Sequence, residues 1–156
     1  MEISDLLSPD AVVPALKVQS KKQLLQELAS RAYALVNRPE RKVFEVLIER
    51  ERLGTTGVGQ GIAIPHGRLP LDKIFGLFAR LDQPIDYEAV DGQPVDLVFM
   101  LLAPEGAGAD HLKALARVSR LLRSQAICEK LRAARTAEAL YAILIAPQNG
   151  AAAHAA

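Results

Sequence analysis

The sequence predicts an α/β fold: a mixed sheet of about five strands sandwiched between helices on both faces. Short apolar segments typical of strands alternate along the chain with longer segments whose apolar residues recur at helical spacing. Of the 156 residues, 50% are hydrophobic and 24% are charged, which suffices for one compact domain with a buried core. We expect this domain to span residues 1–147. The alanine-rich residues 148–156, including His154, are expected to form a flexible tail.

The first half of the chain is expected to contribute an edge strand and two helices. Residues 11–18 are mostly apolar, but Pro14 removes a hydrogen-bond donor and therefore favours the edge of a sheet. Ser20 is a plausible helix cap, and apolar residues between 24 and 36 recur at helical spacing. A second helix is expected over residues 40–53, begun after a proline and stopped by a glycine.

The second half is expected to supply the rest of the sheet and its second layer of helices. Residues 95–104 form the most apolar segment and should be the central strand. Residues 73–81 are apolar on both alternations, which indicates a strand covered on two faces. A short strand is expected to end at His66, and the remaining helices are expected at residues 110–122, 126–134 and 136–145.

Composition excludes several classes of function. A net charge of +1 and an aromatic content of 4% give no basic surface or stacking platform for nucleic acid. The longest apolar runs, residues 97–103 and 139–146, fall short of the roughly 20 residues that a membrane span needs. The opening MEISDLLSPD lacks the basic start and apolar run of a signal peptide. The single cysteine, Cys128, has no internal disulfide partner, so a cytoplasmic protein is expected.

The segment GTTGVGQGIAIPHGR carries the strongest functional signal. Five of its fifteen residues are glycine, and it presents His66 between a proline and a glycine. Because ligand sites of α/β sheets gather at strand ends, His66 is a candidate catalytic residue. Backbone amides in a glycine-rich loop can surround an anion, and hydroxyl groups can add donors. The candidate phosphate ligands in this loop are Thr55, Thr56, Gly57 and Gly59.

Two further residues suit chemistry on an anion. Arg50 lies in the last turn of the helix that leads into the glycine loop. His111 lies in the first turn of a later helix, where backbone amides and the helix dipole favour negative charge. An imidazole nucleophile beside an anion site, an arginine and a second imidazole is suited to phosphoryl transfer on histidine.

Each of these residues also has a simpler structural interpretation. A histidine at a strand end is often only hydrogen-bonded, the glycines can be turn residues, and Arg50 can belong to a solvated helix face. A metal site built from His66, His111 and Asp110 lacks any supporting ligand spacing, so no metal is expected. Cys128 lies on an apolar helix and is expected to pack in the core.

The same segments resemble a known family. RERLGTTGVGQGIAIPHGR is similar to the active-site segment of phosphotransferase-system EIIA domains of the fructose/mannitol type. YEAVDGQPVDLVFMLLAPEG and the following DHLKALARVSRLLR resemble that family's central strand, loop and second-histidine helix. The resemblance extends from Ile3 to about Pro147, and it is closest to the nitrogen-regulatory branch, EIIA-Ntr.

The resemblance implies a role for each candidate residue. His66 matches the histidine that carries the phosphoryl group, with Nε2 as the favoured atom, and His111 matches the second histidine that supports that group. Arg50 matches an arginine placed near the phosphate. Thr55 stands where serine is common and keeps the hydroxyl, whereas Gln60 stands where asparagine or an acidic residue is more usual.

The resemblance also implies partners. The donor is an HPr-type phosphocarrier, either HPr or its nitrogen-branch counterpart NPr, and no metal or other cofactor is needed. The implied output is binding to regulatory targets, such as potassium transport proteins or sensor kinases, according to phosphorylation state. Two alternatives stay open: a sugar-specific EIIA that passes phosphate to an EIIB domain, and a binding module whose active site no longer works.

Overall fold

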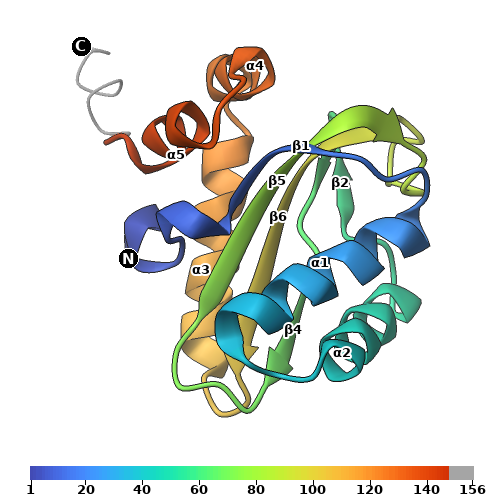
Figure 1. The fold of residues 1–156 in the computed structure, drawn as a ribbon, viewed down its shortest axis with the longest axis vertical. Coiled ribbons are helices and arrows are strands. Elements are labelled where there is room, and N and C mark those ends of the chain that lie inside the picture. The colour runs from blue at the N-terminus through green and yellow to red at the C-terminus, as the bar shows by residue number, and fades with distance from the viewer. Residues whose placement is uncertain (148–156) are drawn as a thin grey trace.

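The computed structural model describes residues 1–147, so the expected tail at 148–156, with His154, lies outside the described residues. Within that range the chain forms a six-stranded mixed sheet and five α-helices, which confirms the α/β prediction with one strand more than expected (Figure 1). The strands are β1 (Val12–Leu16), β2 (Gly57–Gly59), β3 (Ile62–Ala63), β4 (His66–Leu69), β5 (Phe75–Ile85) and β6 (Val95–Pro104). The helices are α1 (Lys21–Val36), α2 (Glu40–Arg52), α3 (Gly108–Leu122), α4 (Gln125–Ala133) and α5 (Ala137–Ile145), with short 3-10 turns at Ile3–Asp5 and Pro9–Ala11.

Strand β6 is the centre of the sheet, as its apolar sequence predicts. It pairs antiparallel with β5 on one side and parallel with β3 and β4 on the other. Residues 97–103 of β6 are all buried, so the most apolar segment of the chain removes the most surface from water. Strand β1 lies at the sheet edge beside β5, and its pairing is irregular between Val13 and Leu16, the stretch that holds Pro14, which has no N–H to donate.

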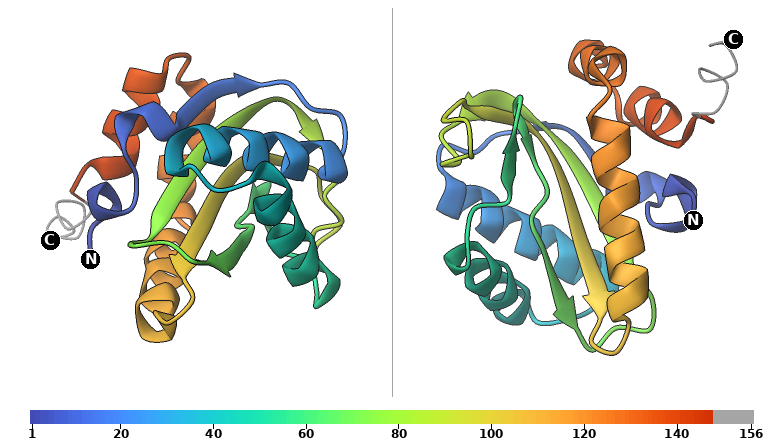
Figure 2. Two further views of the ribbon diagram at one scale, coloured as in Figure 1. Left: turned by 60° about the horizontal axis from the view of Figure 1, so that its bottom comes forward. Right: turned by 180° about the vertical axis from the view of Figure 1, so that it is seen from behind.

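Helices cover both faces of the sheet. Helices α1 and α2 lie side by side on one face, and α3 crosses the opposite face, as the view from behind shows (Figures 1 and 2). The hydroxyl of Ser20 accepts a hydrogen bond from the Gln23 amide at 3.1 Å, which confirms the expected cap of α1. Within residues 1–147, no helix combines the length and apolar character needed to cross a membrane.

The glycine-rich segment differs from the sequence-based expectation. Instead of a loop, it forms the β2–β3 hairpin, whose turn holds Gln60 at a φ of 61°. The prediction that a strand ends at His66 is also wrong. The pairing with β6 is interrupted at Ile64 and Pro65, because proline has no N–H to donate, and it resumes with His66 as the first residue of β4. His66 therefore lies on a strand at the sheet edge between the two helical layers.

Candidate functional site

Close packing between α2 and β4 brings Arg50 to His66. A Cβ on Gly67, the residue after His66, would come within 2.1 Å of the Val46 side chain, so only glycine lets the helix approach the strand this closely. Arg50 lies one helical turn beyond Val46 and so projects from the same side of α2. Its Nε donates a hydrogen bond to Nε2 of His66 at 3.2 Å, and its Nη1 donates to the Gly54 carbonyl at 2.8 Å.

The hydrogen bonds of His66 define its tautomer. Nδ1 lies 2.8 Å from the carbonyl oxygen of Ile64, which can only accept, so Nδ1 carries the proton. Nε2 then holds the lone pair, consistent with its accepting a hydrogen bond from Arg50. The half-buried His66 ring thus presents one nucleophilic nitrogen, Nε2, and both of its nitrogens have a fixed partner.

His111 reaches the same place from the opposite helical layer. It lies in the first turn of α3, its residue is only 5% exposed, and its ring centroid is 5.4 Å from that of His66 with the planes at 76°. Nδ1 of His111 accepts a hydrogen bond from Nε of Arg68 at 3.4 Å. Nε2 of His111 is buried and has no hydrogen-bond partner among residues 1–147. The structure therefore brings together His66, Arg50 and His111.

Sequence reasoning missed Arg68 and its contact with His111. The signal was present, because residues two apart on a strand share a face and Arg68 follows His66 by two on β4. Its importance could not be read from the chain, since the partner His111 is 43 residues away on another element.

Both imidazoles are held neutral near physiological pH. Burial lowers the pKa of His66 below its ordinary 6.5, and the Arg50 charge lowers it further, although the hydrogen bond to Ile64 and the Glu51 carboxylate oppose the change. Burial also lowers the pKa of His111, with smaller contributions in the same direction from His66 and Arg68. A neutral imidazole is the nucleophilic form, so the site is poised for reaction at Nε2 of His66.

We expect the reactivity of His66 to survive mild acid. Because the pKa is lowered, the neutral form persists below pH 6.5 and is lost only as pH falls through that lowered value. The test is an NMR titration of the His66 ring together with the rate of modification at Nε2. Arg50→Gln should move the midpoint upward, since a positive charge is removed. A midpoint above 6.5 in the unaltered protein would contradict this reading.

The geometry of the loop before β2 depends on the Glu51 carboxylate rather than on a bound anion. Glu51 is 6% exposed, and its carboxylate accepts hydrogen bonds from the Thr56 amide at 3.0 Å, the Thr56 hydroxyl and the Tyr87 hydroxyl at 3.2 Å. The Lys21 ammonium lies 2.9 Å from the same carboxylate and balances its charge. Thr56, expected as a phosphate ligand, is thus buried with both donors directed at Glu51.

The other expected loop ligands also have structural partners. The hydroxyl of Thr55 accepts from the Gly57 amide at 3.1 Å, which closes a turn. A Cβ on Gly57 would lie 2.8 Å from Ala89, so glycine is required there for packing. Gly59 has a φ of 103° at the hairpin turn, where Asp91 accepts from the following Gln60 amide at 2.9 Å. These residues shape the loop and hairpin around which the site is built.

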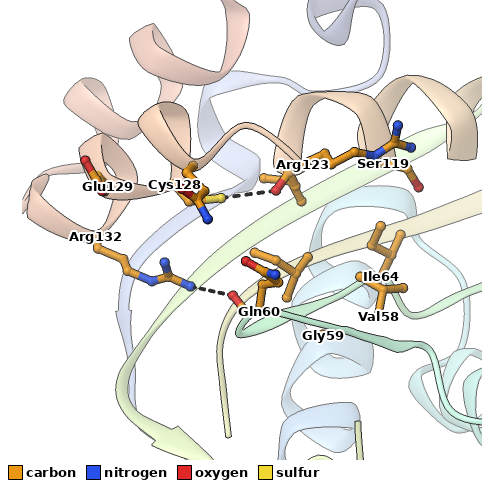
Figure 3. Close-up of a pocket in the computed structure, with 12 residues that line it drawn as sticks. Val58, Gly59, Gln60, Ile64, Ser119, Arg123, Cys128, Glu129 and Arg132 are labelled. Atoms are coloured by element: carbon orange, nitrogen blue, oxygen red, sulfur yellow. Dashed lines mark hydrogen bonds between the residues drawn. The ribbon is translucent and has the colours of Figure 1, made fainter. Parts of the chain in front are cut away.

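A cavity of about 640 Å³ lies between the β2–β3 hairpin and the α3–α4 corner. Gly59 and Gln60 are among the residues that line it (Figure 3). The Arg132 guanidinium donates to the Gln60 carbonyl at 3.0 Å and pairs with Asp96 at 2.8 Å. His66, Arg50 and His111 are not among the residues that line this cavity. Gln60 is therefore tied by its backbone to Asp91 and Arg132, and its side chain borders the cavity. Cys128, expected to pack in the core, is buried at the same corner.

The chain belongs to the family described as the phosphoenolpyruvate-dependent sugar phosphotransferase system, EIIA 2, whose model matches residues 5–146. A nitrogen regulatory protein of Bradyrhizobium diazoefficiens is 68% identical over 153 residues, covering 97% of this chain and all of that protein. The crystal structure of nitrogen regulatory protein IIA-Ntr from Neisseria meningitidis has a TM-score of 0.86 and 38% identity, covering 91% of this chain and 98% of that one. A fructose-specific EIIABC component of Bacillus subtilis is 35% identical over 149 residues, which cover 92% of this chain and 23% of that protein. These relatives confirm the resemblance inferred from the His66 segment.

Proposed function

We propose that this protein is a nitrogen-regulatory phosphocarrier that accepts a phosphoryl group on Nε2 of His66 from an HPr-type carrier, HPr or NPr. The observation that carries the proposal is the fixed tautomer of His66, in which Nδ1–H donates to the Ile64 carbonyl and the Nε2 lone pair faces Arg50. Family membership supports the same chemistry.

The transfer is a displacement at phosphorus between two imidazoles. The Nε2 lone pair of His66 forms the new N–P bond as the N–P bond of the donor phosphohistidine breaks, and that electron pair returns to the donor ring. The proton of His66 stays on Nδ1 and is donated to the Ile64 carbonyl, which stabilises the positive charge that develops on the ring. A ring that keeps this proton remains a good leaving group, so the phosphoryl group can be passed on again.

Charge stabilisation falls to Arg50 and His111. Arg50 is held by the Gly54 carbonyl beside Nε2, and its guanidinium has further N–H groups for the phosphoryl oxygens. Nε2 of His111 is buried and unpartnered within residues 1–147, so it is available to an oxygen of the same group. Positioning and electrostatics account for most catalysis in phosphoryl transfer, and these two residues supply both.

The relatives favour a regulatory role over sugar uptake. Identity is 68% to the nitrogen regulatory protein of Bradyrhizobium and 35% to the fructose-specific component of Bacillus. We place the protein in the cytoplasm, where its carriers act, with potassium transport proteins or sensor kinases as targets. The deciding experiment is incubation with phosphoenolpyruvate, enzyme I and each HPr-type carrier, followed by mass measurement. A gain of one phosphoryl group is expected, and no gain with either carrier would overturn the proposal.

Phosphorylation is expected to weaken binding of targets that cover the site. A phosphoryl group adds about −1.5 to −2 charges. Leu53 and Leu112, which adjoin the site elements in sequence, are 84% and 67% exposed and offer an apolar surface to a partner. A partner without an arginine cluster must desolvate the new charge. Titration of a target with unmodified protein, phosphorylated protein and His66→Ala should show weaker binding only for the phosphorylated form. Equal affinity for all three would show that the target binds elsewhere.

A further inference from the structure

Arg68 is exposed, and the side chain that it contacts is a histidine. Among residues 1–147 its guanidinium forms no ion pair with a carboxylate, and its one hydrogen bond runs from Nε to Nδ1 of His111 at 3.4 Å. A Cβ on Gly108 would lie 3.5 Å from an Arg68 terminal nitrogen, so the start of α3 leaves room for the guanidinium beside His111. Arg68 is therefore placed against an imidazole rather than against an acid.

This contact determines where the proton of His111 resides. A guanidinium can only donate, so Nδ1 of His111 must be the unprotonated, accepting nitrogen. A neutral His111 then carries its proton on Nε2, which is buried and has no partner within residues 1–147. Buried donors in native proteins are nearly always paired, so an unpaired one points to a group that the site receives.

We propose that Arg68 is a positioning residue for phosphoryl transfer: it holds His111 in the Nε2–H tautomer, which donates to an oxygen of the phosphoryl group on His66. This inference rests on the proposed function. The ring centroids of the two histidines are 5.4 Å apart, so oxygens carried by one ring lie within hydrogen-bonding reach of the other. The opposite tautomer would present a lone pair to those oxygens and repel them.

The role differs from that of Arg50. Arg50 contacts the reacting nitrogen of His66 directly, whereas Arg68 contacts His111, which in turn faces the phosphoryl group. Without Arg68, the proton of neutral His111 can move from Nε2 to Nδ1. The Nε2–H group that supports the phosphoryl group is then present in only a fraction of the molecules. The positive charge of Arg68 also contributes to the lowered pKa of His111, which favours the neutral ring.

The test compares Arg68→Met and Arg68→Lys with Arg41→Met, which removes an exposed arginine that pairs at 3.9 Å with Glu45 on the same helix. Side-chain ¹⁵N shifts should show His111 as the Nε2–H tautomer in the unaltered protein and a mixture of tautomers in Arg68→Met. Single-turnover phosphorylation by the phosphorylated carrier should slow about tenfold in Arg68→Met, less than for outright removal of a donor. Arg68→Lys, which keeps a cationic donor, should recover most of the rate and the tautomer.

Three results would overturn the proposal. The first is a protonated Nδ1 on His111 in the unaltered protein, which is measured without any phosphoryl donor. The second is an unchanged rate in Arg68→Met. Failure of the unaltered protein to accept phosphate would instead overturn the proposed function, and the nitrogen shifts would still decide how Arg68 acts on His111. Equal slowing of Arg41→Met would show that the rate follows net charge, and it too would overturn the proposal.

Discussion

His66→Ala is expected to abolish phosphorylation of this protein by an HPr-type carrier. The variant removes Nε2 of His66, the ring nitrogen whose lone pair is the proposed nucleophile toward the phosphoryl donor. We do not expect His111 to replace it, because Nε2 of His111 carries a proton and the residue is only 5% exposed, whereas His66 is half-buried. Alanine leaves no nucleophile at that position, so the expected loss is complete rather than partial.

The measurement is intact-protein mass after reaction with phosphoenolpyruvate, enzyme I and the carrier, with acid and base lability of the label as a check. Phosphohistidine is labile in acid and stable in base, so it is distinguished from phosphoserine. Unfolding curves of the variant establish that it folds. Acid-labile label on folded His66→Ala protein would show that another residue is the acceptor.

Arg50→Ala is expected to slow phosphorylation about 100-fold without changing the acceptor. Removal of one preorganised donor to a developing charge commonly costs about 10²–10³ in rate. Arg50 donates hydrogen bonds to Nε2 of His66 and to the Gly54 carbonyl. Its guanidinium is therefore already in place when the phosphoryl group arrives. The variant also loses the charge that helps to lower the pKa of His66.

Arg52→Ala is the matched control for Arg50→Ala. Arg52 lies in the same last turn of α2, but its guanidinium pairs with Glu49 on the exposed side of the helix. Single-turnover rates should be close to those of the unaltered protein for Arg52→Ala and far lower for Arg50→Ala. If the two variants behave alike, Arg50 belongs to a solvated helix face and has no part in the reaction.

The sequence was sufficient to predict the five helices, the central strand and the candidate residues. Hydrophobic periodicity, the Ser20 cap and Pro14 at an edge are local signals, because each depends on neighbours within one or two turns of the chain. The segment around His66 also carried the family resemblance, since a long motif with fixed spacing leaves few alternatives. Residue type and position in the sequence indicate three candidate residues without any distance between them: His66, Arg50 and His111.

The glycine-rich segment and the acidic residue beside Arg50 were interpreted less well. Glycines at a hairpin turn and at an anion loop have the same conformational freedom, so composition alone could not separate the two. Glu51 lies in the sequence ERER, which is typical of a solvated helix face, yet it is 6% exposed and bonded to Thr56 and Tyr87. Its burial depends on Lys21 from another helix, which supplies the compensating charge.

The sequence by itself determined which residues are present for phosphoryl chemistry, and the tertiary structure decided which atom of each one reacts or donates. Either ring nitrogen of a neutral histidine can carry the proton, and the hydrogen-bond partners of the two nitrogens select the tautomer. For His66 the partner on Nε2 is Arg50, 16 residues away on α2. For His111 the partner on Nδ1 is Arg68, 43 residues away on β4. A contact between separate elements therefore sets the proton of His111, whereas the proton of His66 is set by the nearby Ile64 carbonyl and only supported by Arg50 from another element.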